Sequence, residues 1–374
     1  MKTTRSFISD DIPQVAELHH RIFGSTRGAS RQTISSSELN AYADYFEKVF
    51  LKNPWINEGI NSLVSETPTG RISGFLGVMP RRMSFSGKTI NVAISSQFIV
   101  DPENKSTGAG IELMKRFLSG PQDLSLTDEA NDISRKMWEA FGGVIVPVYG
   151  IHWTRLIRPA RYASSLVSLY FGKGGLLSNA ILKSTRPVSN LIDSIAARKL
   201  PKYFSQPEPQ VSAKRMTSEM LLNCLTEFSD SRALWPEYDA QSLKWVLETI
   251  DSRSQSGTMR MHEIRNNGGA LLGWYIYILE PGREANVLQI MGRKNSIGSV
   301  IDHLFYDAWS LGALAVTGRF DPMFIHSFSD KRCFLKCGYP WLLANSRDHD
   351  LLRSISQGDA LISKLEGEWC LHFR

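Results

Sequence analysis

A loop that contains two glycines and follows a long apolar strand is the part of the sequence with the clearest chemistry. The segment 100–113 reads VDPENKSTGAGIEL, and its second half has the pattern of a helix start. Because the first amides of a helix lack intrahelical acceptors and the helix dipole is positive there, such a start attracts anions. The glycines let phosphate oxygens approach the backbone, and Lys105, Ser106 and Thr107 would add side-chain donors. The loop predicts a phosphate cradle, and a tight strand-to-helix turn without a ligand is the alternative.

Two better-known phosphate motifs do not fit this loop. A nucleoside-triphosphate loop requires a Gly-Lys-Ser/Thr step after its first glycine, and that step is missing here. A dinucleotide fingerprint requires a third glycine and a parallel sheet, whereas the strands before this loop have the pattern of antiparallel pairs. The loop therefore indicates a phosphate-bearing ligand of another kind.

Titratable side chains follow the next predicted strand, at 124–127. Asp128 and Glu129 are the carboxylates nearest in sequence to the end of that strand, and Tyr149 and His152 lie on a later strand. A carboxylate is a residue type that can act as a general base. Solvated loop carboxylates and a histidine without a functional role are the alternatives.

Helices and strands alternate around these residues. Apolar residues at helical spacing predict helices, and alternation predicts strands. The predicted order is helices at 12–22 and 39–51, strands at 61–66, 72–80, 82–85 and 89–100, helix 108–118, strand 124–127, helix 131–141 and strand 144–149. We expect an α/β (α+β) fold with a mixed, mostly antiparallel sheet flanked by helices.

The second half of the chain repeats this order without obvious sequence identity. Its predicted elements are helices at 218–228 and 241–250, strands at 258–264, 270–279 and 286–291, helix 297–310, strand 313–317, helix 325–336 and strand 340–344. The simplest account is a duplicated fold. We therefore expect a first domain at 1–158, a basic connector at 159–210 and a second, degenerate domain at 211–374.

The positive charge of the chain is concentrated in the connector. The formal net charge is +6, yet the segment 150–215 alone carries eleven basic and two acidic residues. A basic excess confined to one connector argues against nucleic-acid binding. Because apolar residues lie among these charges, the connector could rest on an anionic membrane surface as a peripheral contact. A helical bridge packed against both domains is the alternative.

Length and composition exclude several protein classes. A chain of 374 residues with 42% hydrophobic and 21% charged residues belongs to neither the disordered nor the collagen-like class. Asp10 and Asp11 interrupt the place of a signal peptide, and no window has the roughly 18 apolar residues of a spanning helix. The four cysteines lack zinc-site spacing. We expect a cytoplasmic protein without a metal.

The cradle and the residues after it resemble two motifs of the GNAT superfamily, the Gcn5-related N-acetyltransferases. In the first motif, Arg/Gln-x-x-Gly-x-Gly/Ala follows a strand that ends in Val-x-Pro, and the matching residues are Val100, Pro102, Lys105, Gly108 and Gly110. The later motif is similar to Asn131, Ser134, Trp138 and the step Phe141-Gly142-Gly143. The resemblance covers roughly residues 5–158.

The resemblance implies that acetyl-CoA is the co-substrate. Its pyrophosphate would lie on the loop Lys105, Ser106, Thr107, Gly108, Ala109 and Gly110, with Val100 and Asn131 also in the cofactor site. The pantetheine arm would run between splayed strands at 97–100 and 124–128, and the amide of Phe98 or Ile99 would polarise the thioester carbonyl. The tyrosine that usually serves as the acid is Trp138 here. Asp128, Glu129 and Tyr149 are the catalytic candidates.

The function that the resemblance implies is an acyl-CoA-dependent N-acyltransferase, with acetyl as the expected acyl group. Its acceptor would be a small amine, and an amino sugar of surface-polysaccharide assembly is one hypothesis. The second copy keeps basic residues in its equivalent loop, 292–298, but lacks paired glycines, so we expect no CoA there. Two alternatives remain: a non-catalytic CoA sensor or scaffold, and an aminoacyl transferase of the Fem type that uses charged tRNA.

Overall fold

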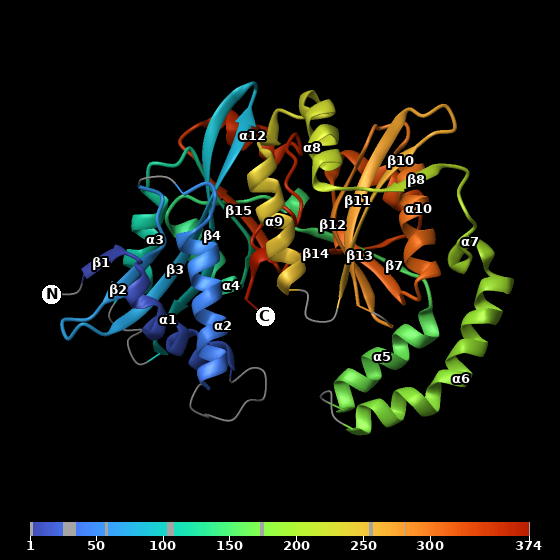
Figure 1. Cartoon of the computed structure of the whole chain (residues 1–374), viewed down its shortest axis with the longest axis horizontal. Helices are drawn as coiled ribbons and strands as arrows, with labels where there is room; N and C mark the ends of the chain where they lie inside the picture. The colour runs from blue at the N-terminus through green and yellow to red at the C-terminus, as the bar shows by residue number, and fades with distance from the viewer. Residues whose placement is uncertain are drawn as a thin grey trace.

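Two mixed sheets, each covered by helices, make up the protein, and they lie side by side in Figure 1. The computed structural model describes residues 3–24, 35–56, 59–102, 108–172, 176–253, 257–280 and 282–373. Within these ranges each sheet is antiparallel except for one parallel strand pair. The predicted fold class, two mixed and mostly antiparallel sheets flanked by helices, is confirmed.

The first sheet has the strand order β1-β2-β3-β4-β5-β15-β6, and β9 also pairs with β3. Its strands are β1 (Thr3–Ser6), β2 (Leu63–Glu66), β3 (Ile72–Phe85), β4 (Lys88–Val100), β5 (Leu124–Ala130), β6 (Val144–Ile145), β9 (Leu234–Pro236) and β15 (Trp341–Asn345). Since side chains alternate along a strand, β3 places Phe75 and Met79 in the core on one face and Leu76 and Val78 in the core on the other.

Helices cover both faces of this sheet. They are α1 (Ile12–His19) and α2 (Ser36–Phe46), each continued by a π-helical turn (His20–Gly24 and Glu47–Leu51), and then α3 (Ala109–Leu118) and α4 (Asp132–Ala140). Helices α1 and α2 share the core of Phe75, whereas α3 and α4 share the core of Leu76. A capping box starts α2, in which Ser35 and Glu38 satisfy one another's backbone amides.

The second sheet has the strand order β14-β7-β13-β12-β11-β10-β8. Its strands are β7 (Ile151–Leu156), β8 (Ser212–Arg215), β10 (Thr258–Arg265), β11 (Leu271–Leu279), β12 (Glu284–Gly292), β13 (Ala315–Arg319) and β14 (Phe334–Cys337). The helices of the second half are α8 (Ser218–Glu227), α9 (Ala240–Arg253), α10 (Ile297–Ser310), α11 (Ile325–Asp330) and α12 (His349–Ser356). In Figure 1, α9 runs between the two sheets.

The two halves of the chain exchange a strand. β15, near the C-terminus, lies between β5 and β6 of the first sheet, where Ala344 pairs with Leu126 and Val144. In return β7 lies between β13 and β14 of the second sheet, where Thr154 pairs with Thr317 and Phe334. The sheets therefore do not coincide with the sequence halves, although the domain boundaries 1–158, 159–210 and 211–374 themselves stay a prediction.

The basic connector forms a helical hairpin that projects from the body (Figure 1). It consists of α5 (Pro159–Gly172), α6 (Leu176–Lys199) and the short α7 (Pro201–Phe204). Asp193 of α6 accepts a hydrogen bond from the Ala160 amide at 2.8 Å, which ties the two helices together. Tyr162 donates to Glu284 of the second sheet at 2.7 Å. None of the helices in the described ranges is long and apolar enough to cross a bilayer.

Some elements differ from the sequence prediction. The helix predicted at 325–336 ends at Asp330, and residues 334–337 form β14. The strand predicted at 144–149 is paired only at 144–145. In both places the pairing partner comes from the other half of the chain, so local pattern could not reveal it.

Candidate functional site

Strands β4 and β5 separate partway along their length and leave an opening in the first sheet. They pair in parallel from Val92 with Leu124 to Ile94 with Leu126, and no further. Just beyond, the β3–β4 register shifts and Gln97 adopts φ +52°, which marks a β-bulge that bends β4 away from β5. The opening lies at the carboxyl ends of both strands.

A buried hydrogen bond holds the bulge in place. His19 of α1 is 1% exposed, and its Nε2 lies 2.6 Å from Oε1 of Gln97. Its Nδ1 lies 3.2 Å from the hydroxyl of Tyr42. Because a non-glycine residue at positive φ is strained, the surrounding contacts must favour this conformation. Helices α1 and α2 therefore fix the shape of the opening.

The glycine-led start of α3 stands at the mouth of the opening. Gly108 has φ +71° and caps the helix, and a Cβ added there would meet no atom within 4 Å. A Cβ on Gly110 would lie 3.2 Å from Val100 and 3.4 Å from Phe98, so this glycine lets the helix approach β4. The first intrahelical bond runs from Glu112 to Gly108, which leaves the preceding amides available for an anion. Lys105, Ser106 and Thr107 lie outside the described residues.

A buried carboxylate anchors the strand end that leads to this helix. Asp101 is fully buried and forms ion pairs with Arg21 at 2.9 Å and Arg71 at 3.1 Å. Its amide donates to the Ser73 carbonyl of β3 at 2.9 Å. The charge pairs thus fix the direction in which the chain leaves β4.

Asp128, a predicted catalytic residue, is buried at the end of β5. It is 3% exposed, so the alternative of a solvated loop carboxylate is wrong for this residue. Arg319 of β13 donates to its Oδ2 at 2.7 Å and to its carbonyl at 3.1 Å. The amide of Glu368 donates to its Oδ1 at 2.7 Å. Asp128 therefore links β5 to the second sheet and to the C-terminal tail.

Glu368 brings a second carboxylate to the same strand end. Its Oε1 accepts hydrogen bonds from the Thr127 hydroxyl at 3.0 Å and from the Glu129 amide at 3.2 Å. Burial, and then the negative charges of Asp128 and Glu129, raise the pKa of Glu368 to about 8. A carboxylate with such a pKa at a strand opening is suited to proton transfer near neutral pH.

Sequence reasoning missed Glu368, because it lies about 240 positions from its partners. A signal was present nonetheless: Glu366 and Glu368 flank Gly367 in a tail that also contains several large apolar residues. A Cβ on Gly367 would lie 2.0 Å from Oδ2 of Asp128, so only glycine allows the tail to approach β5 this closely. Two acidic residues around a glycine in a buried tail indicated a polar site.

The remaining predicted residues lie in various surroundings. The Tyr149 hydroxyl donates to the Ala360 carbonyl at 2.6 Å and accepts from the Ala360 amide at 3.1 Å, and burial raises its pKa. These bonds favour an anchoring role, and a catalytic role for Tyr149 stays a prediction.

Burial lowers the pKa of His152, on β7, to about 3. Asn131 caps α4 by accepting a hydrogen bond from the Ser134 amide at 2.9 Å. Trp138 is 1% exposed and packs on Phe117.

A groove of about 650 Å³ lies between the β3–β4 hairpin, α8 and the segment 232–239. Trp235 and Tyr238 line it, so two of the aromatic residues of the second half face a space large enough for a small molecule. Trp274, Tyr275 and Tyr277 belong instead to the buried core of the second sheet.

The corresponding opening of the second sheet is filled by the chain itself. Strands β12 and β13 pair as far as Val287 with Gly318 and then separate. The Leu365 amide donates to the Leu288 carbonyl at 3.3 Å, and the Glu366 carboxylate accepts from Gln289 at 2.9 Å. The tail therefore lies against β12 where β12 and β13 separate, and its next residues, Gly367 and Glu368, lie against β5 of the first sheet.

Comparisons with known proteins agree with this arrangement. Residues 3–123 match the family model described as an acetyltransferase (GNAT) domain. A GCN5-related N-acetyltransferase from Anabaena variabilis aligns with a TM-score of 0.58 at 10% identity, over 93% of this chain and 73% of that chain. A GCN5-related N-acetyltransferase from Kribbella flavida aligns with a TM-score of 0.53 at 13% identity, over 92% of this chain and 70% of that chain. These structures share the fold over both halves. No curated protein matches the sequence.

Proposed function

We propose that this chain, a member of the GNAT superfamily through its domain at residues 3–123, is an acyl-CoA-dependent N-acyltransferase. The observation that carries the proposal is the opening between β4 and β5 with a glycine-led helix at its mouth. Acetyl-CoA, which supplies an activated thioester, is the proposed donor. Gly108, Ala109 and Gly110 would hold its pyrophosphate through their amides. Lys105, Ser106 and Thr107 complete the proposed cradle.

The bulge in β4 supports the proposal for the acyl end of the site. A bulge frees a backbone amide from the ladder, and Phe98 and Ile99 follow Gln97 immediately. One of these amides would donate to the thioester oxygen as negative charge develops on it. Val100 and Asn131 would border the cofactor at the two strand ends.

Glu368 is the proposed general base. During transfer a bond forms between the amine nitrogen and the acyl carbon, the carbon–sulfur bond breaks, and the amine must lose a proton. Glu368 would accept that proton, since its carboxylate lies between Thr127 and Glu129 at the strand opening. Asp128, paired with Arg319, would position the Glu368 backbone and raise its basicity by charge. Glu129 remains the second proposed carboxylate of the site.

The acceptor is proposed to enter through the groove between the β3–β4 hairpin and α8. Tyr238, which is partly exposed at the wall of the groove, offers an aromatic face on which a sugar can stack, whereas Trp235 is 4% exposed. An amino sugar, free or nucleotide-linked, is therefore the acceptor class we propose to examine first.

Calorimetric titration with acetyl-CoA, and separately with CoA, tests the donor site. We expect micromolar binding that is lost in the double variant Gly108→Asp with Gly110→Asp. Gly298→Asp is the matched control, because Gly298 is also the second residue of a helix, α10, and faces open space. Transfer of radiolabelled acetyl to a panel of amines then tests the reaction. Absence of binding to either compound would contradict the proposal.

A non-catalytic CoA sensor is the second candidate. The observation that favours it is Trp138, which is buried beside Phe117 where the family usually has a tyrosine acid. Binding of acetyl-CoA without transfer to any amine in the panel would support this candidate. Dependence of transfer on charged tRNA would instead reveal an aminoacyl transferase.

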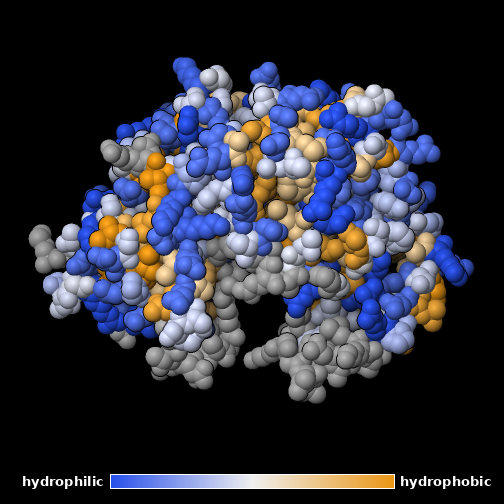
Figure 2. Space-filling model, viewed as in Figure 1, coloured by the Kyte–Doolittle hydropathy of each residue, from blue (hydrophilic) through white to orange (hydrophobic). Residues whose placement is uncertain are grey.

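We further propose that the helical hairpin contacts an anionic membrane surface. Val188, Leu191, Ile192 and Ile195 recur at helical spacing on one face of α6, and each is about half exposed or more. Basic residues accompany this stripe at Arg186, Arg198, Lys199 and Lys202. Figure 2 shows hydrophobic side chains at the outer edge of the molecule over the end of α6. An apolar stripe bordered by positive charge suits a surface of anionic lipid.

A further inference from the structure

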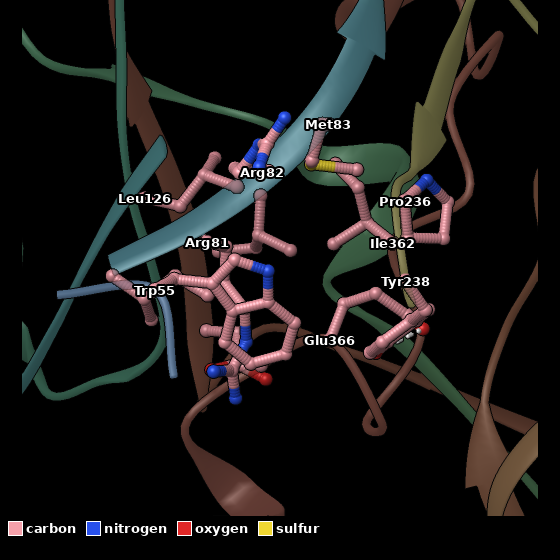
Figure 3. Close-up of a pocket in the computed structure, with 13 residues that line it drawn as sticks. Trp55, Arg81, Arg82, Met83, Leu126, Pro236, Tyr238, Ile362 and Glu366 are labelled. Atoms are coloured by element: carbon pink, nitrogen blue, oxygen red, sulfur yellow. Dashed lines mark hydrogen bonds between the residues drawn. The ribbon is translucent and has the colours of Figure 1, made fainter. Parts of the chain in front are cut away.

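Arg81 is a buried arginine of β3, on the side of the first sheet that faces the second half. It is 5% exposed, and its guanidinium carbon lies 4.4 Å from the centre of the Trp55 ring. Figure 3 shows these two side chains against each other, whereas Arg82 extends in the other direction. A cation over an aromatic face is stabilised, but this contact leaves the N–H groups of the guanidinium without acceptors.

The hydrogen-bond donors of Arg81 are almost all unsatisfied. Its only hydrogen bond among the described residues is a long one, 3.5 Å, from Nη1 to the neighbouring Pro80 carbonyl. Its Nε and Nη2 are buried without a hydrogen-bond partner, and within the described chain no carboxylate lies in ion-pair distance. Burial disfavours the charged form and lowers its pKa, yet a guanidinium keeps its proton at physiological pH. A buried, unpaired cation is costly, so the site favours an anion.

The two carboxylates that line the same cavity are already engaged elsewhere. Asp128 is paired with Arg319. Glu366 accepts hydrogen bonds from Ser363 on one oxygen and from Gln289 and Tyr238 on the other. Neither carboxylate forms an ion pair with Arg81 within the described chain, so Nε and Nη2 of Arg81 remain without acceptors in this cavity.

The cavity adjoins the proposed reaction site. Ile94 and Leu126, the last paired residues before the β4–β5 opening, line it together with Gly367, the neighbour of Glu368. It shares Trp55 and Tyr238 with the groove proposed for the acceptor. The cavity and the groove are therefore neighbours, and we infer that an acceptor seated in the groove extends past these two side chains toward Arg81.

We propose that Arg81 binds a carboxylate of the amine acceptor, an inference that rests on the proposed function and narrows its substrate class. The cavity has a volume of about 20 Å³, which is room for one or two water-sized groups. This space fits the two oxygens of a carboxylate and is too small for a sugar ring. Nε and Nη2 of Arg81 offer the parallel pair of donors that a carboxylate accepts. An amino sugar acid and an amino acid both carry the required group.

Matched pairs of amines test the inference on the unmodified protein. Acetyl transfer to glucosaminuronic acid is compared with transfer to glucosamine, and transfer to glycine with transfer to glycinamide. In at least one pair, we expect kcat/KM for the amine that carries a carboxylate to exceed that of its neutral partner by about ten- to a hundredfold. This range corresponds to the free energy of a hydrogen bond to a charged group. Whichever pair shows the preference identifies the acceptor as an amino sugar acid or an amino acid. Equal rates within both pairs would overturn the inference.

The variant Arg81→Met gives a second readout. We expect it to lose the carboxylate preference and to have a Tm equal to or above that of the parent without ligand, because an unpaired buried charge is removed. Arg347→Gln, an exposed arginine, is the control. A fall in Tm with the preference intact would show that Arg81 is structural and would overturn the inference.

Binding measurements separate this inference from the proposed function. N-acetylglycine and N-acetylglycinamide are titrated into the parent and into Arg81→Met in the presence of CoA. If no amine is acetylated but N-acetylglycine alone raises the Tm of the parent, the carboxylate site stands and the acyltransferase proposal fails. If amines are acetylated and the parent binds N-acetylglycine no better than N-acetylglycinamide, the acyltransferase proposal stands and the carboxylate site fails.

Discussion

At the scale of single residues, the protonation of Glu368 determines the expected pH dependence. A general base works only when deprotonated, and burial beside Asp128 and Glu129 raises the pKa of Glu368 to about 8. We expect kcat/KM to rise with pH and to level off above about pH 8. Glu368→Gln should lower kcat by roughly 10²- to 10⁴-fold and abolish this rise. Steady-state kinetics from pH 6 to about 9.5 check both effects.

A matched control separates loss of the base from a general charge effect. Glu139, on the surface of α4 beside Arg135, is a glutamate outside the proposed site, so Glu139→Gln should keep the parental pH profile. An unchanged profile in Glu368→Gln would contradict the assignment and return attention to Glu129.

The same pKa predicts how stability changes with pH. The pKa of Glu368 is higher in the folded state than the ~4.3 of an unfolded chain, so its contribution to stability is full below about pH 4 and is lost as pH rises toward 8. The loss approaches about 1.4 kcal/mol per pH unit within that window. Glu368→Gln lacks this titration, so the free energy of unfolding of the variant minus that of the parent should increase from pH 5 to 8. Urea unfolding at several pH values measures the difference, and a constant difference would contradict it.

At this scale, whether a property of a residue could be predicted from sequence depended on where in the chain the partners of that residue lie. The glycines of the cradle could be recognised because the features that define it are close in sequence. The start of α3 and the glycines that leave its backbone accessible lie within a few positions of one another. Asp128 was found as a candidate, but its burial was not, since Arg319 and Glu368 come from distant parts of the chain. Arg81 had no sequence signal, because an arginine on a strand is normally exposed and only the packing of Trp55 shows that this one is buried.

At the scale of elements, the hairpin of α5 and α6 makes the membrane proposal testable. Leu191→Ser with Ile195→Ser removes the centre of its apolar stripe, and because both side chains are exposed we expect stability to change by less than about 0.5 kcal/mol. In a sedimentation assay with phosphatidylcholine vesicles that contain phosphatidylglycerol, we expect this variant to lose most of the vesicle binding of the parent protein. Vesicles of neutral phosphatidylcholine alone should bind less of the parent protein than the vesicles with phosphatidylglycerol do.

Exposed apolar residues outside the hairpin supply the control. Leu311→Ser with Ile325→Ser removes two side chains of similar exposure from the body of the protein. If this variant and the hairpin variant bind vesicles equally, the hairpin has no special role. Absence of vesicle binding by the parent would contradict the proposal directly.

Long periodic elements were predictable at this scale, and short strands were not. The apolar pattern placed α3 and β4 within a residue or two, because each buries one face continuously. β1, β8 and β9 have only three or four residues, too few for a pattern to be distinguished from loop. β14 was predicted as part of a helix, and its strand conformation depends on pairing with β7.

At the scale of the whole molecule, the exchanged strands are the feature that sequence could not predict. The sequence pattern predicted a strand at 340–344, close to β15, and only a later strand near His152 in the place of β7, and such a pattern does not show which sheet a strand joins. Each was expected to complete the sheet of its own half. Each sheet instead contains one strand from the other half, since β15 lies between β5 and β6 and β7 lies between β14 and β13.

The exchange predicts that the two halves unfold as one unit. Leu342 and Leu343 of β15 are buried in the first sheet, and burial of one leucine side chain contributes about 1.5–3 kcal/mol. A fragment of residues 1–158 lacks them and would also leave the paired edge of β5 open, at a cost comparable with the whole stability of a small domain. We expect one calorimetric transition for the full chain, and a single urea midpoint by near-UV circular dichroism and by hydrogen exchange of β4 and β11. Fragments 1–158 and 211–374 should each be unfolded alone. Two separate transitions, or a folded fragment 1–158, would show that β15 is dispensable to the first sheet and that the halves are independent domains.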